Sequence, residues 1–160
     1  MFENKVILIT GGTGSFGRTF TKMTLDNHNP KKIIIFSRDE MKQWEMAQQF
    51  KGDLRVRFFI GDVRDRERLY RALDNVDCVI HAAATKFVDL SEKYPLECHD
   101  VNILGSANIA RVAIDKKVKG VIGVSTDKAS PPVKNIYGMS KAVMEKLFIS
   151  LSNNHKTKFT

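Results

Sequence analysis

The sequence has few of the residues that form disulfides or bind metals, and it has no long apolar run. It contains two cysteines, Cys78 and Cys98, and four scattered histidines, without a CxxC pair or a Cys/His spacing typical of a metal site. This excludes a disulfide framework, and we expect no bound metal. No apolar run approaches the roughly 20 residues that cross a bilayer, so we expect no membrane partner. Because the first apolar run begins at Val6, we also expect no signal peptide and a cytoplasmic protein.

The charge of the chain is predominantly positive, which raises the question of a nucleic-acid partner. Lysine and arginine number 26 against 18 acidic residues, giving a formal net charge of +8. Arginines are dense between residues 55 and 71, but acidic residues interrupt them, and Phe58 and Phe59 lie in a strand-like run rather than on a stacking surface. We therefore favour a solvated basic surface that attracts anionic nucleotides, and expect no nucleic-acid partner.

Short apolar runs alternate along the chain with stretches of helical spacing. This alternation is typical of an α/β fold with a doubly wound parallel sheet that helices cover on both faces. The predicted strands are Val6–Ile9, Ile33–Phe36, Val56–Ile60, Val76–Ile80 and Val121–Val124. The predicted helices are Phe16–Asn27, Glu40–Phe50, Asp65–Leu73, Pro95–Lys116 and Ile136–Ser152.

The length of 160 residues fits one domain with a sizeable core, but not two. Residues 155–160 resemble the approach to a further strand, and a complete doubly wound sheet would continue beyond them. We therefore expect residues 1–160 to form an incomplete nucleotide-binding domain, truncated after the fifth strand and the following helix. The final strands and a substrate-binding lobe would be absent.

A glycine-rich segment directly follows the first predicted strand. Gly11, Gly14 and Gly17 stand between strand and helix in the order that a dinucleotide pyrophosphate site needs. The first two glycines allow a sharp turn close to the diphosphate, which free backbone N–H groups would bind, and the third allows close helix packing. A purely structural turn is the alternative. The neighbours that we also place in the coenzyme site are Thr13, Ser15 and Phe16.

The end of the second predicted strand discriminates between the two nicotinamide coenzymes. An acidic residue there accepts hydrogen bonds from the ribose 2′-hydroxyl of NAD, whereas a nearby arginine accommodates the 2′-phosphate of NADP. Ser37 and Arg38 occupy this turn, so the sequence favours NADP. In the alternative, Asp39 takes the acidic role, Arg38 is merely solvated, and the coenzyme is NAD.

Residues after the third and fourth predicted strands complete the predicted coenzyme site. The Asp62 carboxylate and the Val63 amide are suitably placed for an adenine edge, although Gly-Asp-Val is also an ordinary turn. Small residues after the fourth strand would let a ribose and nicotinamide lie against its end, or they serve helix–sheet packing alone. These residues are Ala82, Ala83 and Ala84, and we add Lys86.

Tyr137 and Lys141 carry the strongest catalytic signal. They are four residues apart in a predicted helix and therefore share one face. A tyrosine with its ordinary pKa near 10 is a poor base, and a nearby ammonium favours the phenolate. Alone, such a pair is most often on the surface, but here it follows a glycine-rich first turn and the segment Ser125–Lys128.

These motifs resemble those of the extended short-chain dehydrogenases/reductases. The resemblance rests on Thr10–Gly17 and on the pair Tyr137 and Lys141. It implies a Rossmann fold and NADP as coenzyme. It also implies that the 160 residues correspond to about half of a typical member of the superfamily. Further segments resemble the UDP-N-acetylglucosamine 4,6-dehydratase (inverting) family of polysaccharide biosynthesis, which implies a UDP-N-acetylhexosamine substrate. Those segments are Phe36–Glu40, Arg57–Asp65, His81–Ala84, Tyr94–Cys98 and Ser125–Ala129.

The resemblance also implies a role for each catalytic residue. Tyr137 would deprotonate the sugar 4-hydroxyl as hydride leaves C4 for NADP⁺, with Lys141 holding the ribose and lowering the tyrosine pKa and Thr126 positioning the hydroxyl. Lys128 would then remove the acidified C5 proton while Asp127 protonates the departing 6-hydroxyl, and hydride returns to C6. Retaining relatives carry an acidic residue in place of Lys128, so this pair implies inversion at C5. A structural ion pair is the alternative reading.

Two loops that border the substrate depart from the family pattern, at residues 85–89 and 131–135. Three alternatives therefore stay open. In place of an inverting dehydratase, the enzyme would be a retaining sugar-nucleotide 4,6-dehydratase or a UDP-hexosamine 4-epimerase. In the third alternative, the chain would be a nucleotide-binding module without turnover.

The two longest predicted helices, Pro95–Lys116 and Ile136–Ser152, carry apolar residues on more than one side. One stripe would pack on the sheet, and the second predicts a partner helix and hence a homo-oligomer. Burial under further strands is the alternative.

Overall fold

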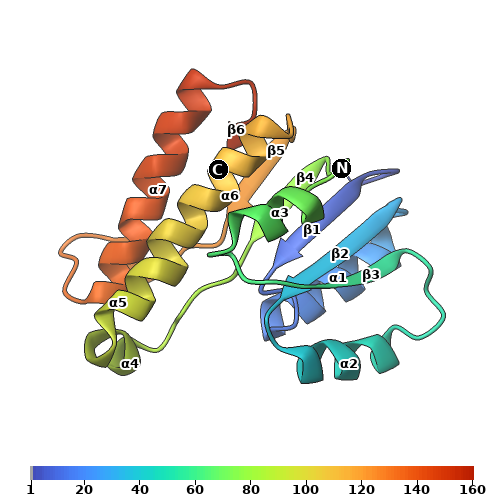
Figure 1. Cartoon of the computed structure of the whole chain (residues 1–160), viewed down its shortest axis with the longest axis horizontal. Helices are drawn as coiled ribbons and strands as arrows, with labels where there is room; N and C mark the ends of the chain where they lie inside the picture. Colours follow the sequence, from blue (N-terminus) through green and yellow to red (C-terminus); the bar gives the residue numbers. More distant parts are fainter. Residues whose placement is uncertain (1) are drawn as a thin grey trace.

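The computed structural model describes residues 2–160, which form a parallel sheet of six strands in the order β3-β2-β1-β4-β5-β6 (Figure 1). This order confirms the predicted doubly wound α/β fold, because the chain runs outward from β1 to one edge and then returns to build the other. The strands are β1 (Val6–Thr10), β2 (Lys32–Ser37), β3 (Val56–Ile60), β4 (Cys78–His81), β5 (Gly120–Gly123) and β6 (Lys158–Phe159).

The helices lie in two layers, one on each face of the sheet. In β1, Ile7 and Ile9 pack in the layer with α1 and α2, whereas Leu8 packs in the layer with α3, α6 and α7. All three side chains are fully buried, which explains the unbroken apolar run and contributes about 1.5–3 kcal/mol for each. The helices are α1 (Ser15–Asn27), α2 (Glu40–Gln49), α3 (Arg66–Ala72), α4 (Val88–Lys93), α5 (Pro95–Cys98), the π-helical η1 (His99–Leu104), α6 (Gly105–Asp115), the 3-10 turn η2 (Asp127–Ala129) and α7 (Ile136–Asn154).

The structure differs from the sequence prediction in four elements. The predicted helix Pro95–Lys116 is a composite of α5, η1 and α6, and the short helix α4 before it was not predicted. The sheet also extends one strand further than predicted, because β6 pairs with β5 in parallel. The fourth strand ends at His81 rather than Ile80, since His81 pairs with Thr10 of β1.

All six strands are parallel, so their carboxyl ends meet at one edge of the sheet. The turns after β1, β2, β3 and β4 gather there, which is where open α/β sheets bind ligands. None of the helices among residues 2–160 is both long and apolar enough to cross a bilayer. Within the same residues, no cluster of three or more His, Cys, Asp or Glu is placed to hold a metal ion.

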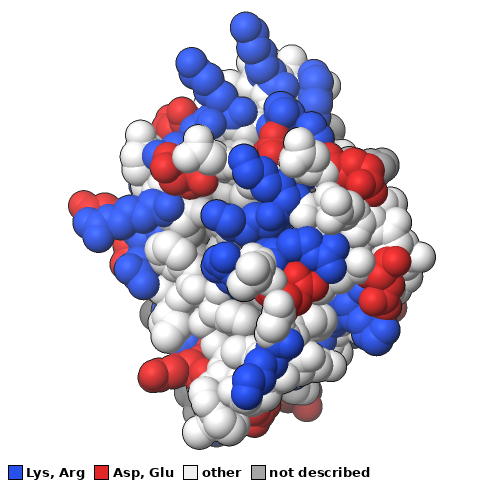
Figure 2. Space-filling view, turned by 90° about the vertical axis from the view of Figure 1, so that its right-hand side faces the viewer, with Lys and Arg blue, Asp and Glu red and all other residues white. Residues whose placement is uncertain are grey.

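Basic and acidic side chains occur together on one face of the molecule (Figure 2). Figure 2 shows lysine and arginine side chains gathered in the middle of one face, with carboxylates around them. Arginines of the stretch 55–71 have acceptors in the chain itself. Arg55 pairs with Asp53 at 2.7 Å, and Arg68 donates from Nε to the carbonyl of Ile60 at 2.8 Å. These contacts hold arginine side chains against β3, an edge strand of the sheet.

Candidate functional site

The turn between β1 and α1 requires glycine. Gly11 has a φ of +65°, and a Cβ there would lie 2.9 Å from the backbone of Ala83 on the neighbouring strand end. A Cβ on Gly17 would collide with the Gly12 backbone, so this glycine lets α1 start close against the turn. Gly14 is the N-cap and offers no side-chain acceptor. The first N–H groups of α1 therefore have no partner within the helix, an arrangement that suits a bound anion.

A cavity of about 530 Å³ opens in front of this turn. Most of the predicted coenzyme residues line it, namely Gly11, Thr13, Gly14, Ser15, Ser37, Arg38, Val63, Ala83, Ala84 and Lys86. The lining also includes Asp39, which the sequence analysis named only for the NAD alternative, and four residues that it missed, namely Phe36, Lys42, Gly61 and Val101. Six predicted coenzyme residues are not in its lining, namely Phe16, Gly17, Asp62, Ala82, Tyr137 and Lys141. Of these, Phe16 is half-exposed on α1 and stacks on Phe20, while Ala82 donates its N–H to the Thr10 carbonyl at 3.2 Å.

The β2 end combines one capping carboxylate with two basic side chains. Asp39 is the N-cap of α2: its carboxylate accepts a hydrogen bond from the Lys42 N–H at 3.0 Å and lies 3.3 Å from Lys42 Nζ. The Lys42 N–H holds the pKa of Asp39 below its usual value. Both carboxylate oxygens are thus engaged at the helix start. Lys42 was missed from sequence, although a lysine three residues after an N-cap returns to the same side of the first turn.

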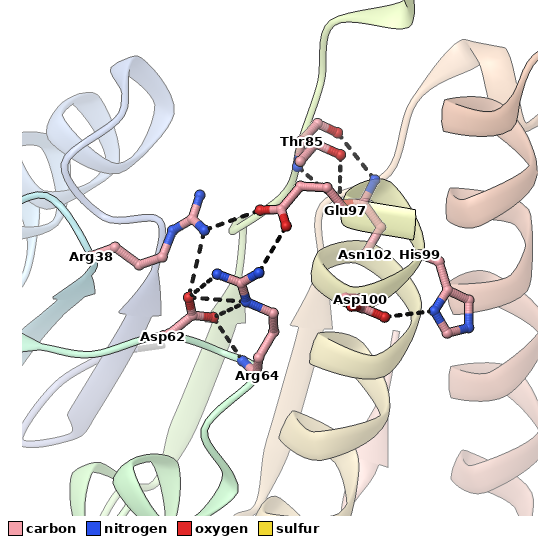
Figure 3. A network of polar contacts seen from close by, with 8 residues as sticks. All are labelled: Arg38, Asp62, Arg64, Thr85, Glu97, His99, Asp100 and Asn102. Atoms are coloured by element: carbon pink, nitrogen blue, oxygen red, sulfur yellow. Dashed lines mark hydrogen bonds and ion pairs between the residues drawn. The ribbon is translucent and has the colours of Figure 1, made fainter. Parts of the chain in front are cut away.

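Asp62 is held by arginines from two directions (Figure 3). Arg64 pairs with it at 2.7 Å and also donates its backbone N–H to it at 2.8 Å, while Arg38 Nη1 lies 3.5 Å away. Burial by itself raises the pKa of Asp62, but the hydrogen bonds from Arg64 outweigh it and the pKa is lowered. Glu97 of α5 completes the network, with contacts of 3.4 Å to Arg38 and 2.8 Å to Arg64.

Tyr137 and Lys141 lie in the first turns of α7 and are both buried, at 9% and 3% exposed. Lys141 donates from Nζ to the Val124 carbonyl at 2.8 Å, which fixes its ammonium at the end of β5. Burial lowers the pKa of Lys141 to about 8. The sequence alternative of an exposed surface pair is therefore wrong.

The turn η2 packs directly on the start of α7. Gly138 makes this possible, because a Cβ at that position would collide with the carbonyl of Lys128. Thr126 caps η2 by accepting from the Lys128 N–H at 3.4 Å. Ser125 is tied to α7 as well, because its hydroxyl donates to the Glu145 carboxylate. The fold thus brings the predicted residues of the two segments to one place.

Asp127 and Lys128 form the ion pair that the sequence analysis kept as an alternative. Lys128 Nζ lies 3.4 Å from Asp127 Oδ1, and the Thr126 hydroxyl donates to the same oxygen at 3.0 Å. The Asp127 side chain is 87% exposed, and these two contacts lower its pKa, the Thr126 hydroxyl most. In this state Asp127 is a carboxylate rather than an acid.

A buried chain of hydrogen bonds connects the end of β1 to the helix segment η1. The Ala83 N–H donates to Thr10 Oγ1 at 3.1 Å, and the Thr10 hydroxyl donates to His81 Nδ1 at 2.7 Å. His81 Nε2 then donates to Ser106 Oγ at 3.0 Å, and Ser106 donates to the Asn102 carbonyl. Burial lowers the pKa of His81 to about 3, so the ring is neutral and fits this pattern.

Asn102 extends the connection to α7 and was missed from sequence. Its side chain accepts from the Thr85 N–H at 2.9 Å and donates to Ser140 Oγ at 2.9 Å. Ser140 in turn donates to the Tyr137 carbonyl at 2.7 Å. The local sequence offers no signal for this residue, because its burial and its partners Thr85 and Ser140 follow from the packing of separate elements.

Comparisons with known proteins place this geometry in a family. The family model described as "Polysaccharide biosynthesis protein" matches residues 7–160. A UDP-N-acetylglucosamine 4,6-dehydratase (inverting) of Campylobacter jejuni is 52% identical over 162 residues, covering 99% of this chain and 48% of the relative. A UDP-glucose 4-epimerase of Rickettsia bellii is 48% identical over 153 residues, covering 94% of this chain and 44% of the relative.

A solved structure agrees with the fold. The dTDP-glucose 4,6-dehydratase DesIV of Streptomyces venezuelae, a double mutant with NAD and DAU bound, superimposes with a TM-score of 0.85 and 25% identity. The match covers 96% of this chain and 54% of DesIV. The chain thus spans about half the length of the relatives it matches. By its family match and its doubly wound sheet, this chain belongs to the polysaccharide biosynthesis protein family, within the short-chain dehydrogenase/reductase enzymes.

Proposed function

We propose that this chain is the coenzyme-binding and catalytic part of an NADP-dependent UDP-N-acetylglucosamine 4,6-dehydratase that inverts C5. The observation that carries the proposal is the packing of η2, with Thr126 and Lys128, on the turn of α7 that bears Tyr137. The buried pair of Tyr137 and Lys141 supports oxidation at C4, and the 52% identical dehydratase supports the substrate.

The residues of the large cavity fit a nicotinamide dinucleotide. The close approach of Gly11 to Ala83 and the open N–H groups of α1 suit a pyrophosphate. Arg38 and Lys42 line the same cavity and suit a 2′-phosphate, while the Asp39 carboxylate is engaged as an N-cap. NADP is therefore favoured over NAD. The bound coenzyme would supply the hydride acceptor for C4 and the donor for C6.

Tyr137 would take the proton of the sugar 4-hydroxyl. A buried ammonium on the same helix face stabilises a phenolate, and Lys141 is placed there. Thr126, at the start of η2, would hold the hydroxyl toward Tyr137. The Lys141 ammonium, which donates to Val124 O here, has further N–H groups for a ribose hydroxyl.

Lys128 and Asp127 would carry out the elimination. Once C4 is a ketone, Lys128 would take the C5 proton, and Asp127 would give its proton to the departing 6-hydroxyl as water leaves. In the chain described here Asp127 is exposed and its pKa is lowered. An ammonium cannot accept the C5 proton either, so the elimination requires the proton of the Lys128 ammonium to pass to Asp127. Burial of the pair by the bound sugar and the remaining half of the enzyme would favour this neutral amine and neutral carboxyl over the ion pair.

Two further features are part of the proposal. Met139 and Val143 are half-exposed on one side of α7, and we propose that this apolar stripe joins two copies of the protein in a homo-oligomer. We also propose a cytoplasmic location, consistent with two unpaired cysteines.

The principal alternative is a 4-epimerase, because the Rickettsia bellii relative is almost as similar. A retaining 4,6-dehydratase is the other. All three enzymes would share oxidation at C4, so Tyr137 and Lys141 do not separate them. Lys128 favours the inverting dehydratase, since it offers a base for C5. By itself, the chain would bind coenzyme without turnover, because it spans about half of its relatives.

The test is product analysis in deuterated water. The chain is fused to the remaining part of the Campylobacter jejuni relative and incubated with NADP⁺ and UDP-N-acetylglucosamine. We expect NMR to show a 4-keto-6-deoxy sugar with deuterium at an inverted C5, and Lys128→Met to lose at least about 100-fold in rate. A C4 epimer without a 6-deoxy product would support the epimerase instead. A 6-deoxy product with C5 retained would support a retaining dehydratase.

A further inference from the structure

Glu97 contacts Arg38, the arginine that the proposed function needs for coenzyme binding. Arg38 touches two carboxylates through one nitrogen, Nη1, at 3.4 Å from Glu97 and 3.5 Å from Asp62 (Figure 3). Both distances are long for a charge-assisted hydrogen bond. The Arg38 side chain is 53% exposed, and its other N–H groups contact neither carboxylate. This pairing is weak and open to exchange.

Arg64 is the firmly held member of the same network. It contacts Asp62 at 2.7 Å and Glu97 at 2.8 Å, and its side chain is less exposed than that of Arg38. Glu97 therefore keeps a partner when Arg38 moves away. Two guanidinium groups and two carboxylates also make the network neutral, so an arriving anion meets no net attraction from it.

The Arg38–Glu97 pair lies between two cavities. Arg38 lines both the 530 Å³ cavity and a second one of about 440 Å³, whereas Glu97 lines only the second. A phosphate in the first cavity would thus reach Arg38 without contacting Glu97. The two anions compete for one guanidinium.

We propose that Glu97 determines coenzyme selectivity by competing with the 2′-phosphate of NADP for Arg38. This rests on the proposed function. NAD lacks that phosphate, so its affinity is largely independent of the competition. Removal of the Glu97 charge frees Arg38 and leaves the network with one positive charge, which favours the coenzyme that carries the additional phosphate.

Isothermal titration of the chain with NADP⁺ and NAD⁺ at low salt tests this. We expect Glu97→Gln to strengthen NADP⁺ binding about three- to fivefold, the range of one exposed ion pair, and to change NAD⁺ binding less than about twofold. Asp115→Asn is the matched control, because Asp115 pairs with Arg66 at 3.1 Å at the far end of α6 and is equally exposed. The control should leave both affinities unchanged.

A second variant isolates Arg38. In an Arg38→Ala background, Glu97→Gln should change the NADP⁺ affinity less than about twofold, because the competed guanidinium is gone. An unchanged or weakened NADP⁺ affinity in Glu97→Gln overturns the inference, as does an equal gain for both coenzymes or a gain that persists without Arg38. If the wild-type chain binds neither coenzyme, the proposed function fails together with it. If the wild type prefers NADP⁺ and Glu97→Gln leaves that preference unchanged, only the inference fails.

Discussion

Burial lowers the pKa values of two side chains, Lys141 and His81. Lys141 is 3% exposed, its ammonium has the Val124 carbonyl as acceptor, and its pKa falls to about 8. His81 is fully buried, has a pKa near 3, and serves as a neutral link between hydroxyl groups. One buried side chain is thus poised near neutral pH, whereas the other is removed from titration there.

The Lys141 pKa predicts how stability depends on pH. The folded state has a pKa of about 8 against 10.5 for the ordinary lysine, so between these values the unfolded chain binds more protons. Stability therefore rises with pH across this window, by up to about 3 kcal/mol. Urea denaturation at pH 7.5 and pH 10.5 measures it, with Lys141→Met as the variant that lacks this increment. Equal pH dependence in the two proteins would contradict the prediction.

At the scale of elements, the contact between η2 and α7 brings together the segments that carry the proposed catalytic residues. It rests on one glycine, because the Lys128 carbonyl fills the space where a Cβ of residue 138 would be. Asn135 caps α7 by accepting from the Gly138 N–H at 2.7 Å, which fixes the start of the helix at the same point. The position of Lys128 relative to Tyr137 is therefore decided by backbone packing.

Gly138→Ala should separate these two elements. Alanine favours a helix over glycine by about 1 kcal/mol, but the collision with a backbone carbonyl outweighs this, and we expect a net loss of about 1–3 kcal/mol. Gly120→Ala is the control, since the nearest atom to its Cβ is 3.8 Å away, and it should cost less than about 1 kcal/mol. Thermal unfolding of both variants checks the order, and a Gly138→Ala protein as stable as wild type would refute it.

At the scale of the whole molecule, α7 has one side on the core and another free. Met144 and Phe148 are buried against the sheet, whereas Met139 and Val143 are 50% and 45% exposed. Figure 1 shows α7 at the outer side of the molecule beside α6. A long helix with an exposed apolar stripe is suited to pairing with a second copy.

Val143→Glu tests that pairing. A carboxylate in the stripe would have to be buried without a partner at the interface, which is costly, so we expect the assembly to dissociate to the 18.1 kDa monomer. Light scattering after size-exclusion chromatography gives the mass. Gln48→Glu, which adds the same carboxylate at an exposed position of α2 in the other helix layer, should leave the mass of the wild type. A wild-type chain that is monomeric at all concentrations would remove the proposed oligomer.

Local patterns determined the fold and predicted many of the residues that line the cavity. The apolar runs predicted five of the six strands because a strand buried on both faces must be apolar throughout. The glycine turn after Val6–Ile9 could be predicted because its requirements are local. Gly11 has a φ of +65°, and a Cβ on Gly17 would collide with the backbone of Gly12. The pairing of Tyr137 with Lys141 on one helix face could be predicted because a spacing of four residues suffices for it.

Only the tertiary structure decided which charges meet. Arg38 follows β2, Asp62 follows β3 and Glu97 lies in α5, and nothing in their local sequence specifies an ion-pair network. The same holds for Asn102, whose side chain joins Thr85 to Ser140 across the core, and for the break of the predicted helix Pro95–Lys116 into α5, η1 and α6. Apolar periodicity reports which side of an element is buried, whereas long-range polar contacts depend on how separate elements pack, and this the sequence by itself left undetermined.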